Sequence, residues 1–184
     1  MSDKYLNNTE QSEIVDDNIN KYLSLSLGGE DYGISILQVR EILVMVDITP
    51  LPQAADYVRG VINLRGRIIP VVDMRGIFGM QSSDYTDETC VIVVEVNNGD
   101  NEECCQMGTI VDKVNEVVNI ENKNIDPVPN FGEACNMSCL KGMGKTDTGV
   151  VIILDIDKVL AYEDVGAYQD KSNSEAGNGQ QRAA

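Results

Sequence analysis

Two aspartates occupy matching places in the chain and could act as a pair of catalytic carboxylates. Asp73 and Asp155 each follow an apolar stretch typical of a strand, and each precedes a short helical segment. Paired carboxylates carry general acid–base chemistry when one holds a proton and the other does not. A carboxylate just before a helix also accepts hydrogen bonds from free backbone N–H groups. We therefore expect both aspartates to cap helices.

Five cysteines form a second chemically capable group. They are Cys90, Cys104, Cys105, Cys135 and Cys139. The adjacent pair and the CxxxC pair could bind a soft metal or form a redox couple, but CxxxC is not a usual zinc spacing. The sequence also contains no histidine, which removes the commonest general base and metal ligand. We expect reduced thiols and no metal, and a cysteine-based metal-binding or redox protein is the alternative function.

A third group gathers at the predicted tip of a β-hairpin. It consists of Arg59, Asn63, Arg65 and Arg67. Gly66, within this tip, can adopt the positive φ that a tight turn requires. The arginines could form ion pairs with Glu41 or other nearby acids, which is a common role for surface arginine. Arginine beside exposed valine and isoleucine is also typical of protein interfaces, and we favour this interpretation.

The overall charge narrows the range of partners. The formal net charge is −16, so the chain repels the phosphates of nucleic acids and anionic lipids. Residues 1–20 are polar and acidic and lack the apolar centre of a signal peptide. No apolar run approaches the roughly 18 residues that a membrane span needs. We expect a cytoplasmic protein that binds no nucleic acid and does not insert into a membrane.

The two halves of the sequence resemble each other. Gly33 and Gly108 stand 75 positions apart, and the residues that follow them match at the same offset. The proline-bounded corner at 48–52 returns at 125–129, and Gly60 and Asp73 return 82 positions later as Gly142 and Asp155. Several matches in the same order indicate an internal duplication.

Each half contains about five short, alternating or β-branched runs and only one or two helical turns. This spacing leaves no room for the long helices of a doubly wound α/β fold. We therefore predict an all-β protein of two similar five-stranded barrels packed around a hydrophobic groove, with few short helices. Residues 1–20 and 164–184 are polar, and we expect them to be flexible tails flanking one domain at 21–163.

Several of these segments resemble the CheW family of bacterial chemotaxis coupling proteins. The resemblance rests on Tyr32-Gly-Ile, Val39-Arg-Glu-Ile, the RGxxNLRGxxxPVxD pattern over 59–73, and the valines and acids of 111–117. It extends in order over about residues 20–163. It implies two intertwined SH3-like five-stranded barrels around a groove, no enzyme activity and no cofactor.

The resemblance also implies partners and a site. Proteins of this family link the cytoplasmic tips of chemoreceptors to the regulatory domain of the histidine kinase CheA, within arrays at the membrane. The family pattern assigns receptor or kinase contact to nine residues of this sequence. They are Val39, Glu41, Ile42, Gly60, Asn63, Arg65, Gly66, Val114 and Val117. The last two match positions that line the receptor groove, where an amphipathic helix would bind.

Overall fold

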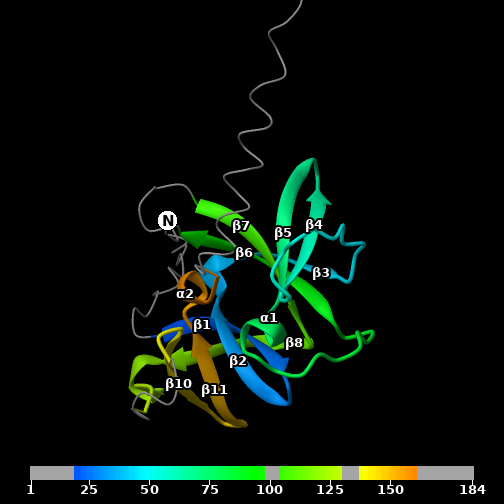
Figure 1. Cartoon of the computed structure of the whole chain (residues 1–184). Helices are drawn as coiled ribbons and strands as arrows, with labels where there is room; N and C mark the ends of the chain where they lie inside the picture. The colour runs from blue at the N-terminus through cyan, green and yellow to red at the C-terminus, as the bar shows by residue number, and fades with distance from the viewer. Residues whose placement is uncertain (1–18, 98–103, 130–136, 161–184) are drawn as a thin grey trace, which may run out of the picture.

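The strands form two sheets that pack against each other (Figure 1). The computed structural model describes residues 19–97, 104–129 and 137–160. Strand β1 (Ile19–Leu27) begins within the predicted N-terminal tail, and the remaining tail residues lie outside the described ranges. None of the helices in these ranges is long and apolar enough to cross a membrane.

One sheet has five strands in the order β3-β6-β7-β5-β4. Its members are β3 (Val39–Val44), β4 (Val58–Leu64), β5 (Arg67–Asp73), β6 (Cys90–Asn97) and β7 (Cys104–Val111). All neighbours are antiparallel except β5 and β7, which are parallel. Helix α1 (Met74–Ile77) follows β5.

The other sheet has six strands in the order β8-β1-β2-β11-β10-β9. Its members besides β1 are β2 (Glu30–Ser35), β8 (Lys113–Glu121), β9 (Ile125–Asp126), β10 (Leu140–Thr146) and β11 (Gly149–Leu154). Only β2 and β11 are parallel. Helix α2 (Ile156–Leu160) follows β11, and the short 3₁₀ turns η1 (Ile36–Gln38) and η2 (Asn122–Asn124) precede β3 and β9. The all-β prediction of two similar units with few short helices is confirmed.

The pairing registers reproduce the internal repeat. Gly33 of β2 lies opposite Ile153, and its counterpart Gly108 lies opposite Val71, which is 82 positions before Ile153. The register shift where β3 pairs with β6 also recurs where β8 pairs with β1. Replacing β3, β4, β5, β6 and β7 by β8, β10, β11, β1 and β2 turns one strand order into the other, apart from the short strand β9 at its end. The two sheets are therefore built to the same plan.

Each sheet nevertheless draws on both halves of the sequence. Strands β1 and β2 come from the first repeat but pair with β8 and β11 of the second. Conversely, strands β6 and β7 come from the second repeat and complete the sheet of β3, β4 and β5 from the first. The halves are thus exchanged rather than folded one beside the other.

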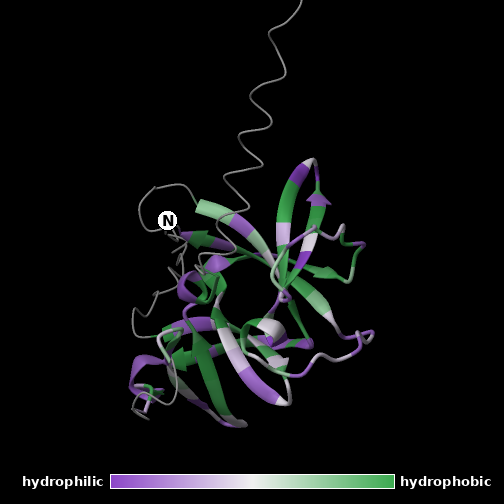
Figure 2. Cartoon of the chain, viewed as in Figure 1, coloured by the Kyte–Doolittle hydropathy of each residue, from purple (hydrophilic) through white to green (hydrophobic). Residues whose placement is uncertain are grey.

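Three apolar clusters hold this arrangement together. The largest combines side chains of both sheets, such as Leu25 and Ile34 from one and Ile92 and Val94 from the other, all fully buried. A second cluster fills the five-stranded unit and a third the six-stranded unit. Figure 2 shows hydrophobic strands that end in hydrophilic tips, most clearly at the β4–β5 hairpin. Burial of these β-branched side chains stabilises the fold.

Candidate protein-binding site

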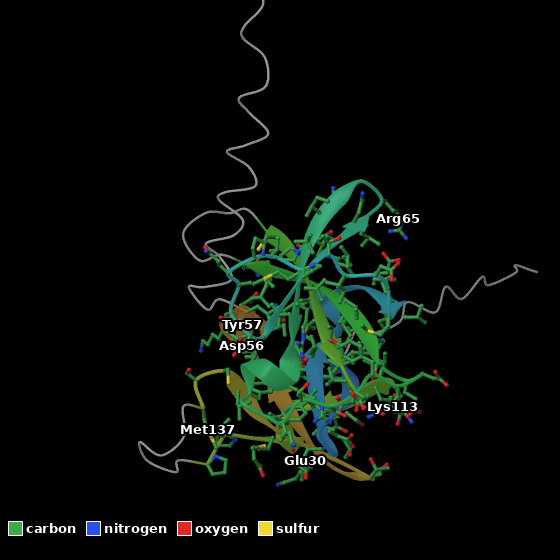
Figure 3. The ribbon with its side chains drawn as sticks, turned by 45° about the vertical axis from the view of Figure 1, so that its right-hand side comes forward. Glu30, Asp56, Tyr57, Arg65, Lys113 and Met137 are labelled. Carbon is green, nitrogen blue, oxygen red and sulfur yellow. The ribbon has the colours of Figure 1, made fainter. Side chains whose placement is uncertain are left out.

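The β4–β5 turn presents Arg65 at the outer end of the five-stranded unit (Figure 3). Arg65 and Gly66 form a two-residue turn with φ of 52° and 84°, between the paired residues Leu64 and Arg67. Positive φ at both central positions is the geometry that matches the twist of a hairpin. The Asn63 side chain accepts a 2.8 Å hydrogen bond from the Gly66 backbone N–H. Asn63 and Gly66 therefore shape the turn that positions Arg65.

Arg65 forms a two-bond ion pair with Glu41. Its Nη1 and Nη2 donate to the two carboxylate oxygens, each at 2.9 Å. The arginine side chain is 76% exposed and the glutamate 27%. An exposed pair contributes at most about 1 kcal/mol to stability, but two parallel bonds fix the orientation of the guanidinium. Glu41 thus holds a largely exposed arginine in a defined position.

Exposed aliphatic side chains lie on the strands beside this pair. Strand β3 alternates, with Glu41 and Leu43 half-buried and Ile42 and Val44 exposed at 45% and 78%. On β5, Ile68 is exposed at 60%. Apolar side chains of this size cost free energy in water, and their combination with arginine is typical of protein contacts. We call Glu41, Ile42, Val44, Arg65 and Ile68 the first rim.

The six-stranded unit carries an equivalent surface of different charge. Val117 and Val150 are exposed at 48% and 57%, and they are the repeat counterparts of Ile42 and Ile68. The counterpart of Arg65 is Asp147, and Glu116 replaces Glu41. We call Glu116, Val117, Asp147 and Val150 the second rim. The apolar pattern is therefore shared by both repeats, whereas the arginine belongs to the first rim alone.

The structure divides the nine predicted residues into three kinds. Glu41, Ile42, Arg65 and Val117 have exposed surface available to a partner. Val39 and Val114, 75 positions apart, are both partly buried against the core shared by the two sheets. Gly60, Asn63 and Gly66 shape the backbone. The predicted set spans both sheets, with seven residues on the five-stranded sheet and two on β8.

Gly60 is one of the predicted residues that shape the backbone rather than contact a partner. Its φ is 140°, and a Cβ atom at this position would lie 2.0 Å from the Thr49 carbonyl oxygen. Thr49 pairs with Val61 in an isolated bridge beside this contact. Only glycine allows the corner at Thr49 to approach β4 so closely.

Two other members of the predicted arginine group take different positions. Arg59 donates two hydrogen bonds to Asp73, at 3.2 and 2.7 Å, and Asp73 in turn accepts from the backbone N–H of Arg75. This confirms Asp73 as a helix cap and assigns Arg59 to a half-buried ion pair within the fold. Asp155 accepts from the Lys158 backbone N–H at 3.3 Å, as a cap also would. Arg67 lies exposed beside the turn.

Sequence reasoning missed Val44, Ile68 and Val150 as candidate contacts. Period-two alternation outward from Ile42 is the signal that could have identified Val44. Ile68 and Val150 are each the second residue after a hairpin turn, where alternation alone does not say which face meets solvent. The repeat offset links these two residues once one of them is known to be exposed.

The cysteines show no sign of a metal or redox centre in the described ranges. Cys90, Cys104, Cys105 and Cys139 are free thiols, whereas Cys135 lies outside those ranges. Cys104 and Cys105 lie in β7. Burial raises the pKa of Cys90 and of Cys139, and a hydrogen bond to the Glu95 carboxylate raises the pKa of Cys104. A raised pKa lowers the thiolate fraction on which metal binding and nucleophilic attack depend.

No cluster of three or more Cys, Asp or Glu side chains suited to a metal ion occurs among the residues described.

Comparisons with known proteins match almost the whole described region. The family profile of the CheW-like domain matches residues 21–164. A chemotaxis protein CheW from Klebsiella aerogenes is 34% identical over 154 residues, which cover 84% of this chain and 89% of that protein. A CheW from Thermotoga maritima is 33% identical over 138 residues, or 75% of this chain and 85% of that protein.

A solved structure also matches the fold. The crystal structure of the scaffolding protein TtCheW from Thermoanaerobacter tengcongensis superimposes with a TM-score of 0.69 at 32% identity. The match covers 79% of this chain and 94% of that one. The family profile, the sequence identities and the structural match agree with one another, and the chain belongs to the CheW family.

Proposed function

We propose that this protein is a non-enzymatic adaptor that couples chemoreceptors to the histidine kinase CheA on the cytoplasmic side of the membrane. The observation that carries the proposal is the Arg65–Glu41 pair, an oriented and mostly exposed arginine among exposed aliphatic side chains. Family membership supplies the class of partner, since the relatives are chemotaxis proteins.

The first rim is the proposed contact for the CheA regulatory domain. Ile42 and Val44 supply apolar area, and Arg65 supplies charge-assisted hydrogen bonds whose direction Glu41 fixes. Buried aliphatic anchors beside an arginine account for much of the binding energy in typical interfaces. Because the second rim lacks the arginine, the two rims offer different chemistry to a partner.

The proposed receptor contact lies between the two units. Val39 and Val114 are equivalent residues on β3 and β8, and both pack against the core shared by the two sheets. An amphipathic helix bound there would meet aliphatic side chains from both repeats, with Val117 at the side of the second unit. This position would let one protein hold a receptor tip and a kinase domain together.

The proposed adaptor needs only the domain at residues 21–163. Every residue assigned a contact here lies in that domain, and the predicted tails at 1–20 and 164–184 contribute none. No step of the proposed function uses a cofactor or a catalytic group.

Reconstitution with receptor membranes and purified CheA tests the proposal. Arg65→Glu places a second negative charge beside Glu41, so we expect receptor-stimulated kinase activity to fall at least about tenfold, which corresponds to about 1.4 kcal/mol. Lys123→Glu is the matched control, because Lys123 is 74% exposed on η2, away from both rims. This control should activate the kinase as wild type does.

Binding assays separate the two contacts. Arg65→Glu should weaken binding to the isolated CheA regulatory domain, and Val114→Asp should weaken binding to receptor membranes. If folded Arg65→Glu supports wild-type kinase activity, the first rim is not the kinase contact. If neither partner binds the wild-type protein, the adaptor function itself is wrong.

A further inference from the structure

The chain passes between the two sheets at two equivalent places. It leaves the six-stranded sheet through η1 (Ile36–Gln38), which joins β2 to β3. It returns through Asp112, the single residue between β7 and β8. Leu37 at the centre of η1 and Asp112 are 75 positions apart, so the repeat relates one crossing to the other. Short segments at the ends of rigid elements are where hinge motion between packed units occurs.

Helix α1 holds the crossing at Asp112. Arg75 donates to Asp112 Oδ1 from Nε at 2.7 Å and to Oδ2 from Nη2 at 2.6 Å. The same Oδ2 accepts a 2.9 Å hydrogen bond from the backbone N–H of Gly28, directly after β1. This carboxylate therefore ties the helix that follows the five-stranded sheet to a strand of the six-stranded sheet.

Helix α2 holds the crossing at η1. Asp157 Oδ1 accepts from Gln38 Nε2 at 3.1 Å and from the backbone N–H of Asn97, the last residue of β6, at 2.9 Å. Asp157 follows the six-stranded sheet, whereas β6 belongs to the five-stranded sheet. In each attachment one carboxylate therefore joins a helix, a crossing and the end of a strand of the opposite sheet.

The two attachments use equivalent positions with different chemistry. Gly28 and Asn97 are counterparts in the repeat. When Gly33 of β2 is aligned with Gly108 of β7, the strands paired with them, β1 and β6, align with an offset of 69 positions, and this offset relates Gly28 to Asn97. Arg75 and Asp157 are counterparts at the 82-residue offset. At α2 the helix supplies the carboxylate itself. At α1 the equivalent residue is Arg75, which instead binds the carboxylate of Asp112 in the crossing.

The polar contacts of the α1 attachment are the stronger of the two sets. Its bonds from Arg75 join two charged groups, and this interaction lowers the pKa of Asp112. Phe78, just after α1, also stacks on Tyr32 of β2 with ring centroids 5.7 Å apart. The α2 attachment has one charged acceptor and two neutral donors, and Gln38 Oε1 is buried without a hydrogen-bond partner in the described residues. An unsatisfied buried oxygen destabilises that side.

We propose that the two sheets form a hinge that pivots at the Arg75–Asp112–Gly28 attachment and opens at the Gln38–Asp157–Asn97 attachment. Opening changes the angle between the five-stranded and six-stranded units while each unit stays intact. The inference rests on the crossings and their contacts and holds whatever partner the protein binds.

Residual dipolar couplings, measured by NMR on the full chain, test the hinge. Couplings from one rigid body fit a single alignment tensor, whereas couplings from two moving units do not. We expect Asp157→Ala and Gln38→Met each to give different tensors for the two sheets. The exchange rate of the Asn97 amide should rise about tenfold in Asp157→Ala, as expected for losing one hydrogen bond. The Gly28 amide should keep its wild-type rate.

Lys145→Gln is the matched control. It removes a 2.6 Å ion pair to Asp126 within the six-stranded sheet, so a single tensor should still fit. Gln38→Met carries the test by itself if Asp157→Ala does not fold. A single tensor in every folded α2 variant would overturn the hinge. Separate tensors in Arg75→Gln with a single tensor in both α2 variants would overturn the assignment of pivot and opening side.

Discussion

Arg65 and Glu41 join the two edge strands of one sheet. Glu41 lies on β3 and Arg65 in the turn after β4, and these strands stand at opposite ends of the five-stranded order. The Thr49–Val61 bridge also brings the segment that follows β3 against β4. The ion pair therefore lies where the sheet closes on itself, and closure of this kind removes exposed strand edges. Arg65, which we propose contacts a partner, therefore also contributes to the closure of the sheet.

The Arg65–Glu41 pair should matter much less for stability than for coupling. Because the arginine is 76% exposed, we expect Arg65→Ala to lower the free energy of unfolding by less than about 1 kcal/mol. Urea denaturation of Arg65→Ala, Glu41→Ala and the double variant measures the interaction between the two side chains. A coupling energy above about 2 kcal/mol would show that the pair is mainly structural.

Gly60→Ala should be among the most destabilising single changes in this domain. The new methyl group would meet the Thr49 carbonyl oxygen at 2.0 Å, and the φ of 140° is itself unfavourable for alanine. We expect a loss of more than about 3 kcal/mol in the free energy of unfolding. Gly66→Ala is the control, since φ there is 84° but no atom lies within 4 Å. Equal losses in the two variants would contradict the steric explanation.

Thr109→Val should stabilise the protein. Thr109 is 0% exposed, and its hydroxyl has no hydrogen-bond partner in the described residues. Exchanging an unsatisfied hydroxyl for a methyl group of similar size should add about 1–2 kcal/mol to the free energy of unfolding. Thr89→Val should have the opposite effect, because Thr89 Oγ1 accepts a 2.8 Å hydrogen bond from the Thr86 N–H. Thermal unfolding followed by circular dichroism compares both variants with wild type.

The Arg75–Asp112 pair should make stability depend on pH. The hydrogen bond from Arg75 holds the pKa of Asp112 below its ordinary value in the folded protein. The stabilisation is therefore fully present above the unfolded pKa of about 4 and is lost as the pH falls through the lower folded pKa. Urea denaturation between pH 7 and pH 3 should show the stability of Arg75→Gln converging with that of wild type in acid.

A constant difference between these two proteins across that pH range would exclude the ion pair as the cause. Lys145→Gln again serves as the control, because its ion pair lies on the surface, with the two side chains 61% and 51% exposed.

The strands and the repeat could be predicted from the sequence because both are local or periodic signals. Runs such as Cys90–Asn97 are rich in β-branched residues, and the prolines near Thr49 and Asp126 mark equivalent corners. The exchange of strands between the halves could not be predicted from the residue pattern, and only the family resemblance implied intertwined units. Hydrophobic pattern says which face of a strand is buried, but it does not say which strand becomes the neighbour.

The candidate site was predictable in part for a similar reason. The motif drew attention to Arg59 and Arg65 together, and their separate roles depend on contacts across the fold. Arg59 meets Asp73, 14 residues away along the chain, while Arg65 meets Glu41, 24 residues away. Ile68 was missed because exposure at a barrel surface depends on how the sheet curves.

The exchanged strands have an evolutionary consequence. A chain with only one repeat would own three strands of one sheet and two of the other, so it could complete neither alone. Two copies of such a chain could complete both by trading their first two strands. The duplicated gene then corresponds to a domain-swapped homodimer whose subunits became covalently joined. Joining them freed each half to diverge, and the first now carries Arg65 where the second carries Asp147.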